Sequence, residues 1–141
     1  MATNQAIRGR WHINVPVPAA VTIGMPVLVG VLSGVVIALQ PIPTPTSPTT
    51  ATIDLGDDCY FLTVIGQSSQ SPVSGLAINP GDELFASGTF DATTNVTYSL
   101  TIDKTRGNCP FGNALDSVAS GATNTACRVR LKGNGSGPYA A

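Results

Sequence analysis

The chain has 141 residues, a length typical of one domain, with 15 Gly and 11 Pro and with charged residues at only 11%. An ordinary soluble domain carries about 25% charged residues, so Ser, Thr, Asn and Gly must cover much of this surface. The net charge of −1 argues against a nucleic-acid-binding protein, which needs clustered Lys and Arg to displace counterions from phosphates.

Residues 1–12 are polar apart from one large aromatic side chain, and they predict an extended N-terminal arm. Arg8, Arg10 and Trp11 are the arm's candidate partner contacts, because Trp and Arg dominate protein interfaces. The alternative is that Trp11 covers the chain's own core.

A long uncharged stretch follows the arm, and residues 21–39 are strongly apolar. Residues 25–30 and 31–39 predict two short strands joined by a Gly-containing bend, because continuous runs rich in Val are typical of strands covered on both faces. The alternative is a secreted or membrane-anchored β-domain with residues 13–39 as signal or anchor. Prolines at positions 16, 18 and 26 argue against a spanning helix. We therefore expect no membrane contact.

Four prolines lie within residues 41–48, and Thr and Ser surround them. Proline lacks the amide donor that a strand needs, so residues 41–52 predict an extended Pro/Thr-rich loop. Such a loop is a stiff connector or a contact for a neighbouring subunit.

The next segments predict short strands separated by turns. Residues 59–65 are apolar on both alternating sets, which predicts a central strand with Cys59 buried. Asn79-Pro80-Gly81-Asp82 is a tight-turn sequence, and a strand should follow it over residues 83–87. Residues 90–95 are typical of a hairpin loop.

The following strand, residues 96–102, alternates so regularly that Val96, Tyr98, Leu100 and Ile102 should share one face. Residues 104–110 predict a turn. Residues 113–120 fit two helical turns or a strand equally well.

The last predicted strand has two chemically distinct faces. Cys127, Val129 and Leu131 alternate with Arg128, Arg130 and Lys132, so one face belongs to the core and the other is a basic strip. That strip is a second candidate for partner contact. Residues 134–141 form a Gly-rich tail.

Together these segments predict a mainly β protein. We expect a compact antiparallel β-barrel or sandwich of about six to eight short strands, formed by residues 13–133 as one domain.

Residue patterns for catalysis or cofactor binding are missing from the sequence. The single histidine, His12, lies in the predicted arm, and three scattered Cys make a poor zinc set. The acid pairs Asp57-Asp58 and Asp82-Glu83 are adjacent, and adjacent strand residues point to opposite faces. We therefore expect no enzyme activity, no metal and no cofactor.

A carbohydrate-binding β-module is a further alternative, because aromatic side chains can form a platform for sugars. The platform would consist of Trp11, Tyr60, Tyr98 and Tyr139.

The order of the segments resembles the capsid cement or head-decoration proteins of tailed bacteriophages. After a Met-Ala-Thr-Asn start come Gly24-Met-Pro-Val-Leu-Val-Gly30, Ser33-Gly-Val-Val36, Gly81-Asp82, Phe111-Gly-Asn-Ala114, Gly121 and Cys127-Arg-Val-Arg-Leu131. The similarity spans residues 20–133. The proline loop at 41–48 and the Arg- and Trp-containing start depart from the family's pattern.

The resemblance implies a compact β-fold, often trimeric, on the outer surface of the phage head. Its partner would be the major capsid protein, and the particle would assemble in the host cytoplasm. A subunit that binds only the expanded shell stabilises that state by mass action. An interface of about 1,600 Å² would suffice.

Overall fold

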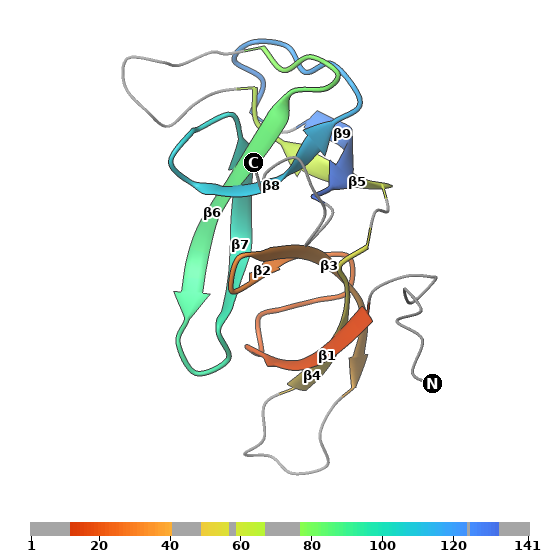
Figure 1. The fold of residues 1–141 in the computed structure, drawn as a ribbon, viewed down its shortest axis with the longest axis vertical. Coiled ribbons are helices and arrows are strands. Elements are labelled where there is room, and N and C mark those ends of the chain that lie inside the picture. Colours follow the sequence, from red (N-terminus) through yellow and green to blue (C-terminus); the bar gives the residue numbers. More distant parts are fainter. Residues whose placement is uncertain (1–11, 41–48, 57–58, 67–76, 124, 133–141) are drawn as a thin grey trace, which may run out of the picture.

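The computed structural model describes residues 12–40, 49–56, 59–66, 77–123 and 125–132. Within these ranges the chain is all-β, without a helix, and nine strands form one antiparallel sheet that does not close into a barrel (Figure 1). The fold is therefore mainly β and sandwich-like, as predicted, and the barrel alternative is wrong.

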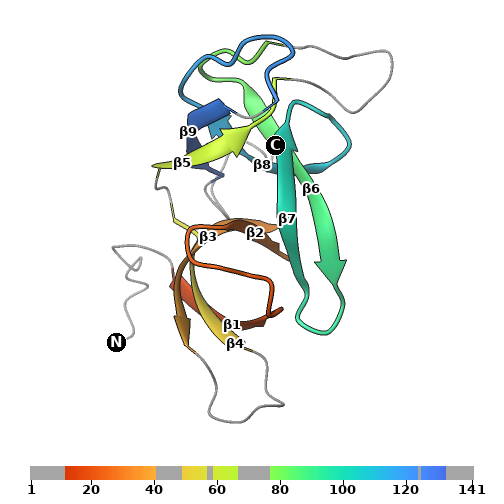
Figure 2. The same cartoon turned by 180° about the vertical axis from the view of Figure 1, so that it is seen from behind.

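The nine strands follow one another along the chain. They are β1 (His12–Val17), β2 (Pro26–Val29), β3 (Leu32–Gln40), β4 (Thr49–Asp54), β5 (Cys59–Val64), β6 (Glu83–Asp91), β7 (Val96–Asp103), β8 (Cys109–Ala114) and β9 (Thr125–Leu131). Their order across the sheet is β1-β4-β3-β2-β7-β6-β8-β9-β5. The β6–β7 hairpin runs along one side of the molecule and joins the two halves of the sheet (Figures 1 and 2).

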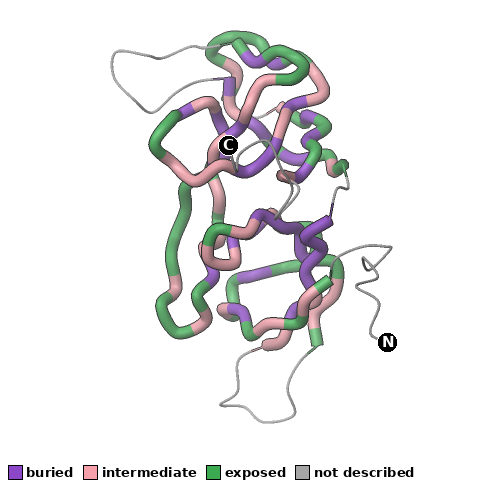
Figure 3. Tube along the Cα trace, viewed as in Figure 1, coloured by how far each residue is buried: buried purple, intermediate pink, exposed green. Residues whose placement is uncertain are grey.

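The two ends of the sheet bury side chains on opposite faces, so the protein has two hydrophobic cores. The N-terminal core is built on β1 to β4, and its fully buried side chains include Val17, Val36 and Ile53. The C-terminal core is built on β5 to β9 around Phe111 and Leu131. Figure 3 shows buried segments in both halves.

β2 and β3 form a wall between the two cores. Val27 and Val36 lie in the N-terminal core, whereas Leu28 and Val35 lie in the C-terminal core. Both faces of these strands are therefore covered. This arrangement explains the uninterrupted apolar run and confirms the two strands predicted over residues 25–39. Ile13, Val15 and Val17 of β1 also contribute to the N-terminal core.

A bulge moves β7 from one core to the other. The register with β6 shifts between Ser87 and Thr89, opposite Ser99, whose φ is 52°. Beyond the bulge the side chains change faces, so Tyr98 packs on the N-terminal core and Leu100 on the C-terminal core. The prediction that residues 96–102 present one continuous apolar face is therefore wrong.

Three strands were missed in the sequence, which explains why the count is nine rather than six to eight. β1 contains Pro16, and proline is tolerated there because β1 is an edge strand. β4 begins at Thr49, so residues 49–52 belong to a strand rather than to the predicted loop. β8 begins at Cys109, inside the predicted turn over residues 104–110.

Other boundaries are also revised. His12 belongs to β1 rather than to the arm, and residues 1–11, 41–48 and 133–141 lie outside the described residues. The turn before β6 is confirmed by the hydrogen bond from the Asp82 amide to the Asn79 carbonyl, at 3.0 Å. Residues 115–120 form neither of the predicted elements, although Val118 pairs with Ile78 in an isolated bridge.

β5 is the last strand of the sheet, so the prediction of a central strand is wrong. Leu62 and Val64 point into the C-terminal core, whereas Cys59, Phe61 and Thr63 are exposed. Cys59 is therefore not buried, although Cys127 is, as expected.

Candidate functional site

The outer face of β5 and β9 brings together part of the predicted basic strip. β9 turns Cys127, Val129 and Leu131 into the core and Arg128 and Arg130 outwards, as the alternation predicts. Lys132 follows the end of the strand, so it does not continue the row. Arg8, Arg10 and Trp11 lie outside the described residues.

β5 adds an exposed aromatic ring to this face. Phe61 pairs directly with Arg128, and Cys59 pairs directly with Arg130. Directly paired residues of antiparallel strands have their side chains on the same face. Phe61 is 72% exposed.

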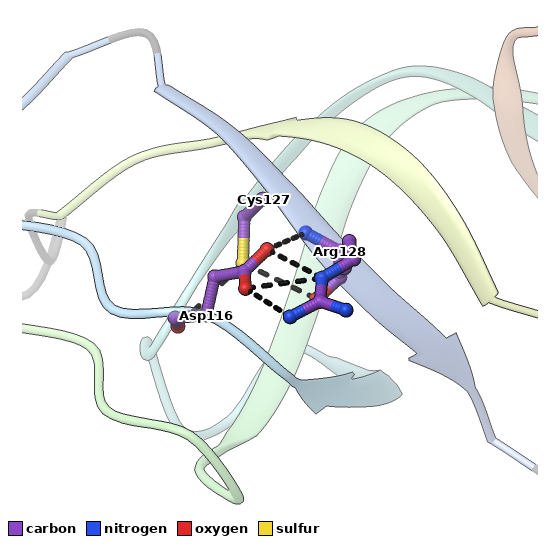
Figure 4. Close-up of polar contacts among 3 residues, drawn as sticks. All are labelled: Asp116, Cys127 and Arg128. Atoms are coloured by element: carbon purple, nitrogen blue, oxygen red, sulfur yellow. Dashed lines mark hydrogen bonds and ion pairs between the residues drawn. The ribbon is translucent and has the colours of Figure 1, made fainter.

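Asp116, in the loop before β9, holds the Arg128 side chain in a fork (Figure 4). The Arg128 Nη2 atom donates to Asp116 Oδ1 at 2.7 Å, and Nε lies 3.1 Å from both carboxylate oxygens. The backbone amide of Arg128 also donates to Asp116 Oδ2 at 2.8 Å. The side chain therefore points in a defined direction although it is half exposed.

The fork changes the ionisation of both partners. Hydrogen bonds from the Arg128 side chain, and then from its amide, lower the pKa of the Asp116 carboxyl. The same interaction raises the pKa of Arg128. Both groups are charged at neutral pH, so the pair is a fixed dipole beside the Phe61 ring.

Sequence reasoning missed Phe61 and Asp116. Alternation alone places the Phe61 side chain on the other face of the strand from Leu62 and Val64. Had β5 been assigned as an edge strand, this second face would have been predicted to be exposed. No local pattern pairs Asp116 with Arg128, because the two residues are 12 positions apart.

A second polar cluster lies where the chain crosses from one half of the sheet to the other. Asp54, the last residue of β4, is fully buried. Its carboxylate accepts hydrogen bonds from the Tyr60 hydroxyl and, at 3.0 Å, from the Gly56 amide. His12 Nε2 lies 3.9 Å from Asp54 Oδ1. The cluster ties β4 to β5 and so fixes the crossing between the two cores.

The remaining sequence candidates do not assemble into a site in the described part of the chain. No group of three or more His, Cys, Asp or Glu side chains there could hold a metal ion. Asp82 is engaged with Lys104 at 2.9 Å, and this hydrogen bond lowers the Asp82 pKa. Asp57 and Asp58 lie outside the described residues.

The tyrosines of the suggested sugar platform do not converge. Tyr60 packs against the C-terminal core and Tyr98 against the N-terminal core, and both are half buried. Trp11 and Tyr139 lie outside the described residues.

Comparison of the chain with protein-family models, with curated proteins and with solved structures found no match. In the described ranges, no helix has the length and apolar character needed to cross a membrane.

Proposed function

We propose that this chain is a non-enzymatic structural subunit that decorates the outer surface of a tailed-phage head and stabilises its expanded form. The observation that carries the proposal is the order of the segments, which resembles that of decoration proteins. Gly24–Gly30 and Ser33–Val36 lie on the wall strands β2 and β3, and the last of these segments lies within β9. These three segments thus fall on elements that organise the fold.

The partner in this proposal is the major capsid protein, bound on the outside of the particle. The resemblance also implies a homo-oligomer, with a trimer favoured. A subunit that bridges several capsomers adds contact area only where the expanded lattice presents it. Selective binding then stabilises the expanded state in proportion to the difference in affinity.

The alternative, a secreted or membrane-anchored domain, requires residues 13–39 to act outside the folded domain. In the structure these residues supply β1, β2 and β3, and Val27, Val35 and Val36 of the shared wall are buried. Removal of this segment would take away three of the nine strands. The packing of this segment therefore argues against that alternative.

The test is cosedimentation of the purified protein with expanded heads and with unexpanded procapsids of the phage that carries the gene. We expect stoichiometric binding to expanded heads and little binding to procapsids. Absence of binding to both shells, or a mature N-terminus after residue 39, would refute the proposal.

The N-terminal arm is tested by deletion of residues 2–11. The deletion spares His12, which pairs with Asp54 in the sheet. We expect the variant to keep its thermal stability and to lose head binding, because Arg8, Arg10 and Trp11 are removed. Full occupancy of heads by the shortened chain would exclude the arm as a contact.

A further inference from the structure

Phe61 and Arg128 form a surface unit in which a large exposed aromatic ring lies directly across the strand pair from a charged side chain. Phe61 is 72% exposed on β5, and Arg128 is its direct partner on β9. Thr63 and Ala126, the next pair along the same face, are small and uncharged. The ring therefore lies directly across from the Arg128 guanidinium group, with Cys59 and Arg130 on one flank and the small pair Thr63 and Ala126 on the other.

Asp116 prepares this unit for binding. An exposed arginine normally loses much side-chain freedom when a partner orders it. Here the Nε and Nη2 atoms are already held by Asp116, and the second terminal nitrogen lies on the side away from the carboxylate (Figure 4). A partner therefore meets an arginine that is already oriented.

We propose that Phe61 and Arg128 are the anchor by which the chain docks on the major capsid protein. The complementary surface is an apolar depression for the ring, bordered by carbonyl or carboxylate oxygens for the guanidinium group. Such a surface complements the unit, because arginine offers only donors and a positive charge. This inference rests on the proposed function and adds the residues and the partner chemistry of the contact.

Phe90 supplies the matched comparison. It is 58% exposed, at the far end of the β6–β7 hairpin, and its direct partner on β7 is Thr97. Phe90 thus has comparable apolar exposure without an oriented charge across the strand pair. Aromatic and arginine side chains that dock together are typical binding hot spots, whereas single exposed apolar residues are common.

The experiment compares F61A, R128A and F90A in binding titrations with expanded heads. Hot-spot truncations cost a factor of about 30 or more in affinity, so F61A and R128A should bind at least about 30-fold more weakly. F90A should bind within about twofold of the unchanged protein. D116A should weaken binding less than R128A, because the arginine remains but is no longer held.

The outcomes separate this inference from the proposed function. If the unchanged protein binds heads and F61A binds equally well, the anchor is refuted while the decoration role stands. If F90A loses as much affinity as F61A, the specific role of the Phe61–Arg128 unit is also refuted. Failure of the unchanged protein to bind any shell refutes the decoration role itself. Thermal unfolding of each variant checks that these exposed substitutions leave the fold intact.

Discussion

Val27 and Leu28 are neighbours on β2, and their side chains lie in different hydrophobic cores. Val27 is fully buried in the N-terminal core, and Leu28 is 3% exposed in the C-terminal core. A strand on the surface of a sandwich has one buried face. β2 has two, because the sheet buries opposite faces at its two ends.

Substitution of either residue by Ala should therefore destabilise the protein. We expect L28A to lower the free energy of unfolding by about 2–5 kcal/mol and V27A by about 1–3 kcal/mol, because each leaves a cavity. The exposed V31A control, next to the same strand, should change it by less than about 0.5 kcal/mol. Urea unfolding measures all three. An unchanged free energy of unfolding for V27A or L28A would contradict the burial of both faces of β2.

Tyr60→Phe tests the tie between the two halves. The Tyr60 hydroxyl donates to the buried Asp54 carboxylate, and its loss leaves an acceptor less well satisfied. Hydrogen bonds to charged groups contribute about 1.5–3 kcal/mol, so Y60F should lower the free energy of unfolding by that amount. Y98F removes a half-buried hydroxyl that has no hydrogen bond to any described residue, and it should cost less than about 0.5 kcal/mol. Equal effects of the two substitutions would show that the Tyr60–Asp54 hydrogen bond does not stabilise the crossing between the two halves.

Ser99 tests the bulge that moves β7 between the cores. Its φ of 52° is unfavourable for a residue with a Cβ atom, and Gly88 opposite it has no room for one, because a Cβ would collide with the Tyr98 carbonyl. Ser99→Gly should raise the free energy of unfolding by about 0.5–1 kcal/mol, since glycine adopts this φ without strain. Thr101→Gly, on the same strand without a positive φ, should lower it by about 0.5–1 kcal/mol. Destabilisation by S99G would show that the bulge lacks this conformation.

The sequence predicts those features that the residue pattern within a single segment determines. The alternation of Cys127, Val129 and Leu131 suffices to orient β9, and Pro80-Gly81 suffices for the turn before β6. The bulge at Ser99 depends on the facing Gly88, and the exposure of Phe61 depends on β5 having a neighbour on one side only. These are properties of strand order, which the pattern within one segment does not contain. For the same reason the Asp116–Arg128 fork was not predicted.

Acid should destabilise the protein through two aspartates. Hydrogen bonds from Arg128 lower the pKa of Asp116, and hydrogen bonds from Lys104 and from the Asn79 amide lower that of Asp82. A carboxyl whose pKa is lower in the folded state stabilises the fold above its unfolded pKa, and this contribution is lost as the pH falls through the folded pKa. The loss should therefore begin below about pH 5, near the unfolded value of about 4.

The measurement is the urea midpoint from pH 6 downwards for the unchanged protein and for D82N/D116N. The double variant should be less stable at pH 6, and the two curves should converge in acid. K104M/R128M keeps both carboxylates and their backbone amide donors but removes the charged side-chain partners, so it should lose most of the same pH dependence. Parallel curves for all three proteins would show that these ion pairs do not contribute to the acid response.

The three cysteines should react with alkylating reagents in an order set by burial. Cys59 is exposed on β5, Cys109 is half buried on β8, and Cys127 is buried. Burial raises the pKa of the Cys109 thiol, an effect that the nearby charge of Lys132 partly opposes, and burial also raises the pKa of Cys127. Because the thiolate is the nucleophile, both effects slow the reaction of the inner cysteines.

With iodoacetamide at about pH 8, below the ordinary thiol pKa of about 8.5, we expect Cys59 to be labelled first, then Cys109, with Cys127 protected until unfolding. Peptide mass spectrometry over time measures the order, and labelling in denaturant should equalise the three rates. Rapid labelling of Cys127 in the folded protein would contradict the packing of β9 against the C-terminal core.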